Sequence, residues 1–267
     1  MLINYKKLDS DFKSKGFFVI RKFINNKKIL ILKKVLSDLF LIELKKAEFD
    51  ITIFKNNDKL WENPKFCKLI NIFRINYPET FSKIYNNIKN NPQLLSILND
   101  KKIIQLSKKI LKVGLNNIWN GEFMMRIDVP DDIRNTIGWH QEANYYKKQT
   151  QDGKNGIVYW IALSENIKKI NGAIEVKKNS HKIGLIRGKK KQVKKINLNK
   201  RYKSVTFEPD LNILAKFKTE VMEVKIGDMI AMDLRLFHRS GKNRSKIIRL
   251  SCINRVFDTA KMTKDIR

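Results

Sequence analysis

The 267-residue sequence predicts a mixed fold, mainly β, in which an N-terminal layer of helices packs on a C-terminal β-sandwich or barrel. Two observations lead to this prediction. Apolar residues recur at helical spacing before Gly121, and short β-rich runs separated by turn residues follow it. No Gly/Ser-rich or Pro-rich stretch separates the halves. We therefore expect one domain over 1–267, with a helical layer and first strand over 1–120 and the β core over 121–267.

The N-terminal half begins with a predicted strand at residues 16–20, which are aromatic and β-branched. One face of a helix follows, because apolar residues recur at spacings of three and four: Ile29, Leu32, Leu36, Phe40 and Leu44. Residues 60–112 predict several further helices. Proline stops helix propagation at three points in this stretch: Pro64, Pro78 and Pro92.

The C-terminal half consists of short runs with high β propensity. Typical turn pairs, such as Asp152-Gly153 and Asn171-Gly172, separate most of them. The predicted strands are 122–128, 138–146, 156–163, 172–177, 203–207, 219–224, 228–233 and 246–257. Many short strands at this spacing favour a sandwich or barrel.

The chain is strongly basic: 56 Lys and Arg against 26 Asp and Glu give a net charge of +30. Only 12 of the 56 are Arg, the residue preferred for bidentate phosphate and base contacts, so we expect no specific nucleic-acid partner. No apolar run reaches the roughly 20 residues of a membrane span. The absence of an apolar signal core and the presence of only two cysteines predict a cytoplasmic protein.

Residues 176–207 contain no acidic residue and many basic ones. Two interpretations stay open for this stretch. One is a solvated loop between strands, which is the usual meaning of a charge run. The other is a mobile cationic lid at the mouth of a site, where residues such as Lys189, Lys190 and Lys191 attract an anionic substrate.

Candidate metal ligands stand out because the chain has only three histidines: His140, His181 and His238. His140 and Glu142 are two residues apart, so on a strand both side chains point to the same face. His238 follows the predicted strand 228–233 and supplies a second imidazole. Two histidines and one carboxylate form the facial triad of non-haem Fe(II) oxygenases, which leaves positions open for ligands. A structural zinc site would have four protein ligands instead.

A candidate carboxylate anchor lies eleven residues beyond His238, at Arg249. Residues 239–244 predict a hairpin loop, and antiparallel pairing of its arms would return Arg249 to the metal. A guanidinium offers two parallel donors to a carboxylate, and Ser240 can add a hydroxyl hydrogen bond. If Arg249 is instead a surface residue, Arg244 and Arg255 are the next candidates.

Five ordered segments of the sequence resemble the phytanoyl-CoA dioxygenase family of Fe(II)/2-oxoglutarate oxygenases. Residues 11–20 (DFKSKGFFVI) are similar to its opening strand, and residues 139–142 (WHQE) resemble its W-H-Q-D metal motif. The other similar segments are 171–184 (NGAIEVKKNSHKIG), 225–228 (KIGD) and the H-x-S-G-x-N…R pattern of 238–249. The resemblance extends through nearly the whole chain.

This resemblance implies a double-stranded β-helix, a cupin-like jelly roll, with N-terminal helices. It also implies iron held by His140, Glu142 and His238, and 2-oxoglutarate held by Arg249 and Ser240. The implied reaction consumes O₂, converts 2-oxoglutarate to succinate and CO₂, and hydroxylates an aliphatic C–H bond. The substrate stays open. It is an acyl-CoA, after which the family is named and whose anionic nucleotide would suit the basic stretch, or another small metabolite, a lipid, or a sugar or natural-product scaffold.

Two departures from the family pattern concern Glu142 and the pair Lys178-Asn179. Glu142 stands where Asp is more common. Glu still ligates iron, and it is not the Gly or Ala that makes room for halide in halogenases of this kind, so halogenation is disfavoured. Lys178-Asn179 replaces the usual Pro-Gly, which alters a turn and leaves the proposed chemistry unchanged.

Three further residues each have a structural and a functional interpretation. Trp160 lies on a predicted central strand and either packs in the core or lines the site. Arg126 either holds an anionic substrate group or pairs with Asp128 or Glu122. His181 falls in a turn of the family pattern, so a structural or supporting role is favoured over metal ligation.

Two other classes of function compete with the oxygenase. One is a basic protein associated with nucleic acid, which predicts clustered Arg and stacking aromatic residues that the sequence lacks. The other is a non-catalytic, cupin-like binding protein with a vestigial metal site. The intact triad together with Arg249 favours the oxygenase.

Overall fold

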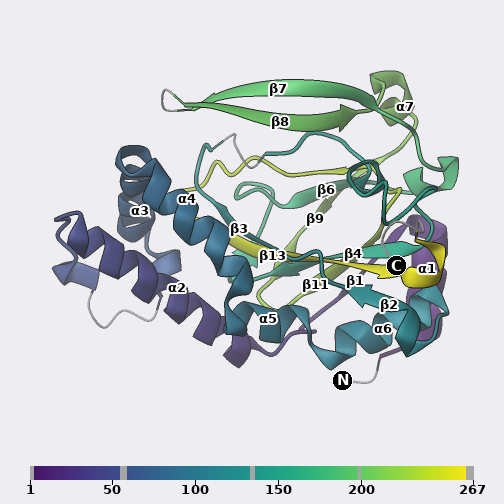
Figure 1. The fold of residues 1–267 in the computed structure, drawn as a ribbon, viewed down its shortest axis with the longest axis horizontal. Coiled ribbons are helices and arrows are strands. Elements are labelled where there is room, and N and C mark those ends of the chain that lie inside the picture. Colours follow the sequence, from purple (N-terminus) through teal and green to yellow (C-terminus); the bar gives the residue numbers. More distant parts are fainter. Residues whose placement is uncertain (1–2, 55–58, 133–135, 198–199, 263–267) are drawn as a thin grey trace.

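The computed structural model describes residues 3–54, 59–132, 136–197 and 200–262 (Figure 1). Within residues 189–205 only the backbone is described. Helices cover one face of a large antiparallel sheet, and smaller sheets lie on its other side. This arrangement confirms the predicted combination of a jelly-roll core and N-terminal helices, although helices contain more of the described residues than strands do.

The helical layer follows the proline pattern of the sequence. Pro64, Pro78 and Pro92 each occupy the first turn of a helix, where the missing N–H is tolerated. Asn63 and Asn91 cap two of these helices by accepting backbone N–H bonds. The α-helices are α1 (Tyr5–Lys15), α2 (Asn26–Lys46), α3 (Pro64–Asn76), α4 (Pro78–Asn87), α5 (Pro92–Leu98), α6 (Lys101–Leu111) and α7 (Leu211–Ala215).

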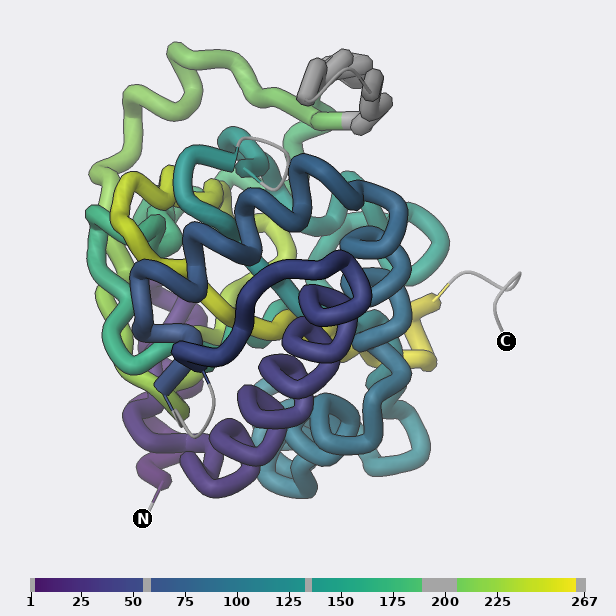
Figure 2. Tube along the Cα trace, turned by 90° about the vertical axis from the view of Figure 1, so that its left-hand side faces the viewer, coloured from purple at the N-terminus to yellow at the C-terminus, as the bar shows by residue number. Residues whose placement is uncertain are grey.

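Single turns of 3-10 helix link several of these elements and precede others. They are η1 (Thr52–Phe54), η2 (Leu60–Glu62), η3 (Ile88–Asn90), η4 (Leu115–Asn117), η5 (Glu142–Tyr145), η6 (Ser180–Ile183) and η7 (Thr259–Lys261). Figure 2 shows α2 running across the face of the molecule beside the later helices. No helix in the described part of the chain is both long enough and apolar enough to cross a bilayer.

The main sheet has the strand order β1-β11-β4-β13-β2, and β3 also pairs with β13. Its strands are β1 (Phe17–Ile20), β2 (Ile118–Asn120), β3 (Met124–Asp128), β4 (Gly156–Ala162), β11 (Met229–Asp233) and β13 (Arg249–Asp258). All of these pairs are antiparallel. The last strand in chain order, β13, therefore lies inside the sheet, between β4 on one side and β2 and β3 on the other.

The smaller sheets complete the sandwich. One has the order β12-β6-β9 and another pairs β10 with β5. A long hairpin, β7 with β8, projects above them (Figure 1). These strands are β5 (Asn166–Ile167), β6 (Ile174–Lys177), β7 (Lys189–Asn197), β8 (Lys200–Glu208), β9 (Thr219–Met222), β10 (Val224–Lys225) and β12 (His238–Arg239).

The main sheet separates two hydrophobic clusters. On β13, Leu250, Cys252 and Val256 pack toward the helices, whereas Ile253 and Phe257 face the smaller sheets. This alternation follows from the two-residue period of a strand. The face toward the smaller sheets also contains the candidate site.

Two local predictions were wrong, and one helix was not predicted. Residues 138–146 form no strand: His140 makes one isolated bridge and Glu142 begins η5. Residues 5–15 form α1, which the sequence analysis did not anticipate. The predicted hairpin between the arms of 239–244 is absent, because β12 pairs with β6 while β13 pairs with β2, β3 and β4.

Candidate metal centre and cavity

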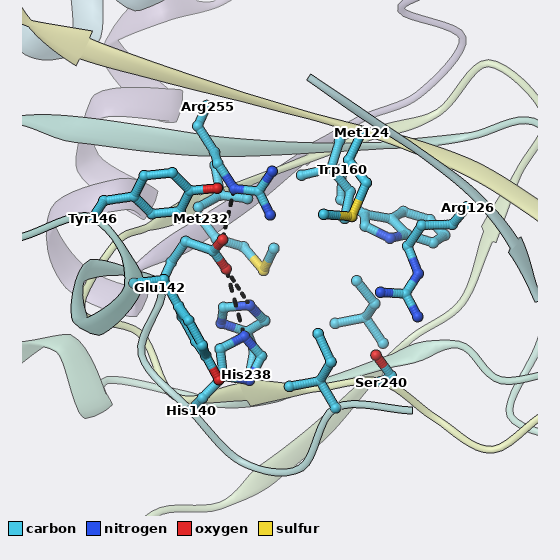
Figure 3. Close-up of a pocket in the computed structure, with 15 residues that line it drawn as sticks. Met124, Arg126, His140, Glu142, Tyr146, Trp160, Met232, His238, Ser240 and Arg255 are labelled. Atoms are coloured by element: carbon cyan, nitrogen blue, oxygen red, sulfur yellow. Dashed lines mark hydrogen bonds and ion pairs between the residues drawn. The ribbon is translucent and has the colours of Figure 1, made fainter. Parts of the chain in front are cut away.

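The three predicted metal ligands come together in one cluster (Figure 3). Glu142 Oε2 lies 3.5 Å from His140 Nε2 and 3.4 Å from His238 Nε2. One potential ligand atom from each residue lies within 4.8 Å of the others. All three side chains are buried. An ion coordinated by all three would keep open positions on one side, as in a facial triad.

Backbone pairing brings the two histidines together. The His140 amide donates to the His238 carbonyl and the His238 amide donates to the His140 carbonyl, both at 3.0 Å. Their ring centroids are consequently 4.2 Å apart. Same-face spacing along a strand therefore does not create this site. It arises from one antiparallel bridge followed by a 3-10 turn that directs Glu142 back toward both rings.

Hydrogen bonds fix the orientation of each imidazole. His140 Nδ1 lies 2.8 Å from the Gly138 carbonyl and His238 Nδ1 lies 3.0 Å from the Leu236 carbonyl. A carbonyl can only accept, so each Nδ1 carries the proton and each Nε2 presents its lone pair to the cluster. Burial, reinforced by His238, lowers the pKa of His140 and favours the neutral form that binds metals.

Glu142 is held ionised by the buried Arg255. The sequence analysis considered this residue only as an alternative to Arg249 for binding a carboxylate of the cosubstrate. Arg255 Nε donates to Glu142 Oε1 at 2.6 Å. Burial favours the protonated carboxyl, but the positive charge of Arg255 outweighs it, so the pKa of Glu142 lies well below its ordinary value. Two neutral imidazoles and one carboxylate suit a divalent metal ion such as Fe(II).

Gln141 fixes the turn that carries the ligands. Its side-chain amide donates to the carbonyls of Gly184, at 2.8 Å, and Arg235, at 2.6 Å. Its carbonyl oxygen accepts the Ile186 amide at 2.8 Å. Because Gln141 is fully buried, these bonds tie the loop to two other segments of the chain.

The cluster opens into a cavity of about 160 Å³ between the sheets. Its wall is mostly apolar, and the polar groups other than the metal ligands include Arg126, Ser240 and Arg255. The remaining lining residues are Met124, Ile137, Tyr145, Tyr146, Val158, Trp160, Ile174, Met232 and Ile253. An apolar pocket with a few convergent polar groups is typical of a small-molecule site.

A second charged cluster is centred on Asp128. Arg249 Nη2 lies 2.5 Å from Asp128 Oδ2, and Arg126 Nη2 lies 2.9 Å from Oδ1. All three side chains are buried. Burial alone would raise the pKa of Asp128, but Arg126 and Arg249 hold it below its ordinary value. Two guanidinium groups therefore share one carboxylate.

Arg249 lies beside the cavity and is not part of its wall. Its guanidinium carbon is 5.9 Å from the ring centroid of Trp160, which does line the cavity. Arg249 Nη1 is buried and has no hydrogen-bond partner among the described groups. Gly172, with a φ of +89°, allows this placement, because a Cβ there would lie 2.9 Å from Nη1.

The other predicted residues divide between the cavity and the scaffold. Ser240, Trp160 and Arg126 line the cavity, and Arg126 also pairs with Asp128, as its structural interpretation predicted. Its contact with an anionic substrate group stays a prediction. His181 is outside the cavity, where its Nε2 lies 3.0 Å from the Lys13 carbonyl. This contact ties η6 to α1 and agrees with a structural role.

The acid-free stretch forms the turn η6 and then the hairpin β7–β8. The base of the hairpin touches the site, because the rings of Phe207 and Tyr145 are 5.1 Å apart. The side chains of Lys189, Lys190, Lys191 and the other basic residues up to Lys203 lie outside the described part, so the cationic-lid interpretation stays a prediction.

Sequence reasoning missed the pair of Arg249 with Asp128 and the pair of Arg255 with Glu142. A usable signal exists on β13: Arg249 and Arg255 are six residues apart, so they face the same side of a strand. Asp128 and Arg126 share a face of β3 for the same reason, and β3 pairs Asp128 with Arg249 directly.

Together, a jelly-roll core and a buried His–Glu–His cluster beside an apolar cavity define the class of non-haem metal oxygenases. The phytanoyl-CoA dioxygenase (PhyH) family matches residues 12–251. The chain belongs to this family, which confirms the resemblance seen in its motifs. Comparison with curated protein sequences finds no match.

Several solved structures have the same fold. AviO1 from Streptomyces viridochromogenes Tue57 is 14% identical with a TM-score of 0.58, covering 98% of this chain and 99% of that one. EctD from S. alaskensis with bound Fe is 14% identical with a TM-score of 0.61, covering 98% and 79%. The epimerase SnoN, in complex with Fe3+, alpha ketoglutarate and nogalamycin RO, is 10% identical with a TM-score of 0.54, covering 95% and 83%. The cofactors predicted from the sequence are bound in two of these neighbours: iron in EctD, and Fe3+ with alpha ketoglutarate in SnoN.

Proposed function

We propose that this protein is an Fe(II)- and 2-oxoglutarate-dependent dioxygenase that hydroxylates an aliphatic C–H bond of a small molecule. The observation that carries the proposal is the convergence of His140 Nε2, Glu142 Oε2 and His238 Nε2 in a buried cluster. Bound iron would supply the O₂ chemistry, with 2-oxoglutarate as the reductant that is converted to succinate and CO₂.

The chain's own groups hold and orient the reactants. Carbonyl acceptors keep both imidazole rings turned toward the cavity, and Arg255 keeps Glu142 ionised. The apolar wall, with Val158, Trp160 and Met232, excludes bulk water from the reacting centre.

Arg249 and Ser240 are the groups we assign to the distal carboxylate of 2-oxoglutarate. Arg249 supports this role through its buried and unpartnered Nη1, because such a donor needs an acceptor that the described side chains do not supply. The Asp128 cluster carries two guanidinium charges against one carboxylate, so an added carboxylate would balance its charge. Ser240 lines the cavity and can add a hydroxyl contact.

For the substrate we propose an anionic small molecule or an acyl-CoA, in contact with Arg126 and Trp160. Arg126 presents positive charge to a mostly apolar wall. An aliphatic portion of the substrate fits the apolar wall, and an acidic group fits Arg126. The assignment of both residues rests on their positions in the cavity.

The test is turnover of reconstituted protein. Purified protein, loaded with Fe(II) without oxygen, is mixed with 2-oxoglutarate, O₂ and a panel of acyl-CoAs and other acidic metabolites, and succinate is measured. We expect Fe(II)-dependent succinate formation that a true substrate increases, with a product heavier by one oxygen atom. Tight metal binding without succinate under any condition would instead support a non-catalytic, cupin-like binding protein.

A further inference from the structure

The Glu142 carboxylate is divided between two partners. Its Oε1 accepts from Arg255 Nε at 2.6 Å, whereas its Oε2 lies 3.4 and 3.5 Å from the two imidazole Nε2 atoms. Figure 3 shows Arg255 on one side of the carboxylate and the histidines on the other. One oxygen is therefore committed to the arginine, and one is left for a metal ion.

Arg255 is itself fixed in place. It is 6% exposed and belongs to β13, where its Cα pairs with Val158 of the neighbouring strand β4. Its guanidinium carbon lies 5.2 Å from the ring centroid of Tyr146, and Nη1 lies 3.4 Å from the Glu122 carbonyl. A buried guanidinium with contacts on several sides keeps its direction better than a free side chain.

A fixed arginine matters here because the metal ligand is Glu. The Glu side chain has one methylene, and therefore one rotatable bond, more than Asp. A free Glu carboxylate can also chelate a metal through both oxygens. Bidentate binding would occupy a position that a facial triad leaves for other ligands.

We propose that Arg255 is a positioning residue that clamps Glu142 Oε1, so that Glu142 ligates the metal through Oε2 alone. The inference rests on the proposed function, because it concerns the same metal site. The contact with Arg255 would keep the coordination positions opposite the three protein ligands open. It also gives a physical reason why a Glu serves at this position in the present chain.

The experiment measures metal binding, so it does not depend on turnover. Fe(II) and Co(II) affinities are measured by calorimetry without oxygen, and the Co(II) absorption spectrum reports the coordination number. The variants are Arg255→Gln, Arg255→Lys, Glu142→Asp and the double variant Arg255→Gln/Glu142→Asp. Arg74→Gln is the control, because it breaks another buried ion pair, with Asp132 at 2.7 Å, and Arg74 does not line the cavity.

We expect Arg255→Gln to weaken metal binding by about ten- to a hundredfold, as second-shell changes typically do, and to alter the Co(II) spectrum. The metal affinity of Arg255→Lys should lie between those of the wild type and Arg255→Gln, because a point charge neutralises the carboxylate but does not hold it in one direction. In the Glu142→Asp background the loss caused by Arg255→Gln should shrink, because the shorter carboxylate does not reach Arg255. Arg74→Gln should bind metal as the wild type does.

Two results would overturn the inference. One is an Arg255→Gln protein with wild-type affinity and spectrum. The other is an equal loss in the wild-type and Glu142→Asp backgrounds, which would make Arg255 a general support of the fold. If Arg255→Gln does not fold, Arg255→Lys decides the comparison by the same criteria. Failure of the wild-type protein to bind metal would overturn the proposed function as well, so the two failures are distinguishable.

Discussion

The two ends of the cavity are built on the same plan with opposite charge balance. At one end Arg255 pairs with Glu142, whose second oxygen faces two imidazoles. At the other end Arg126, which lines the cavity, shares Asp128 with Arg249, which lies beside the cavity. Strand β13 supplies one arginine to each end. The Glu142 end therefore presents a carboxylate oxygen to a cation, and the Asp128 end presents surplus positive charge to an anion.

This difference teaches that a buried Arg–carboxylate pair does not by itself reveal its role. The number of arginines that contact each carboxylate determines whether the pair can still bind a cation or an anion. The variants below test the comparison, beginning with the largest expected effect.

Asp128→Asn should destabilise the fold by about 3–5 kcal/mol, because it removes the charged carboxylate that two buried guanidinium groups contact. Urea unfolding measures the change. The pKa of Asp128 is lower in the folded protein than in the unfolded chain. Ionised Asp128 therefore contributes its full stabilisation above the unfolded pKa of about 3.9, and this contribution is lost as the pH falls. The difference in free energy of unfolding between Asp128→Asn and the wild type should therefore become smaller in acid. Equal unfolding midpoints at pH 7 would show that the Asp128 cluster is not held by charge.

His238→Ala should weaken Fe(II) binding by more than about a hundredfold, since losing a ligand costs at least as much as losing a supporting contact. Anaerobic calorimetry measures it. His181→Gln is the matched control, because His181 lies outside the cavity and should leave metal affinity unchanged. Wild-type iron affinity in His238→Ala would remove the Glu142 end from the comparison.

Arg249→Ala should weaken 2-oxoglutarate binding roughly ten- to over a hundredfold, since hydrogen bonds to charged groups contribute about 1.5–3 kcal/mol. Fe(II) binding should stay nearly intact, because Arg249 contacts Asp128 and none of the three ligands. Arg249→Lys should restore only part of the affinity, because a point charge lacks the fork. Titration of 2-oxoglutarate into the metal-loaded variant measures the change. An unchanged affinity would assign the binding of the distal carboxylate to Arg126 or Arg255, which line the cavity.

Ser240→Ala should have the smallest effect, weakening 2-oxoglutarate by about two- to tenfold, because a neutral hydrogen bond contributes about 0.5–1.5 kcal/mol. The same titration measures it. A loss larger than that of Arg249→Ala would reverse the ranking and make the hydroxyl the main anchor.

The sequence predicted well the features that depend on local pattern. The helix breaks predicted at Pro64, Pro78 and Pro92 occur, and each proline begins the next helix, where its missing N–H and fixed φ are tolerated. His140, Glu142 and His238 were found because so few histidines are available. Their grouping was correct, although the strand expected to carry the first two does not form.

Features that depend on distant partners were not predictable. The Arg255–Glu142 pair joins residues 113 apart in the chain, and Arg249–Asp128 joins residues 121 apart. The strand period places Arg249 and Arg255 on one face of β13, but it does not indicate which carboxylate each arginine meets. The hairpin expected after His238 does not form for the same reason: β12 pairs with β6, and β13 pairs with β2, β3 and β4. Local turn residues do not determine a choice between such partners.

The interior position of β13 has a consequence for the order of assembly. Every other strand of the main sheet precedes β13 in the chain, yet β2 and β3 join the sheet only through it. During synthesis neither arginine-bearing end of the cavity can close until β13 leaves the ribosome. Contacts of such long sequence separation also slow folding. We therefore expect a nascent chain halted before Arg249 to lack the completed main sheet and to bind no metal tightly.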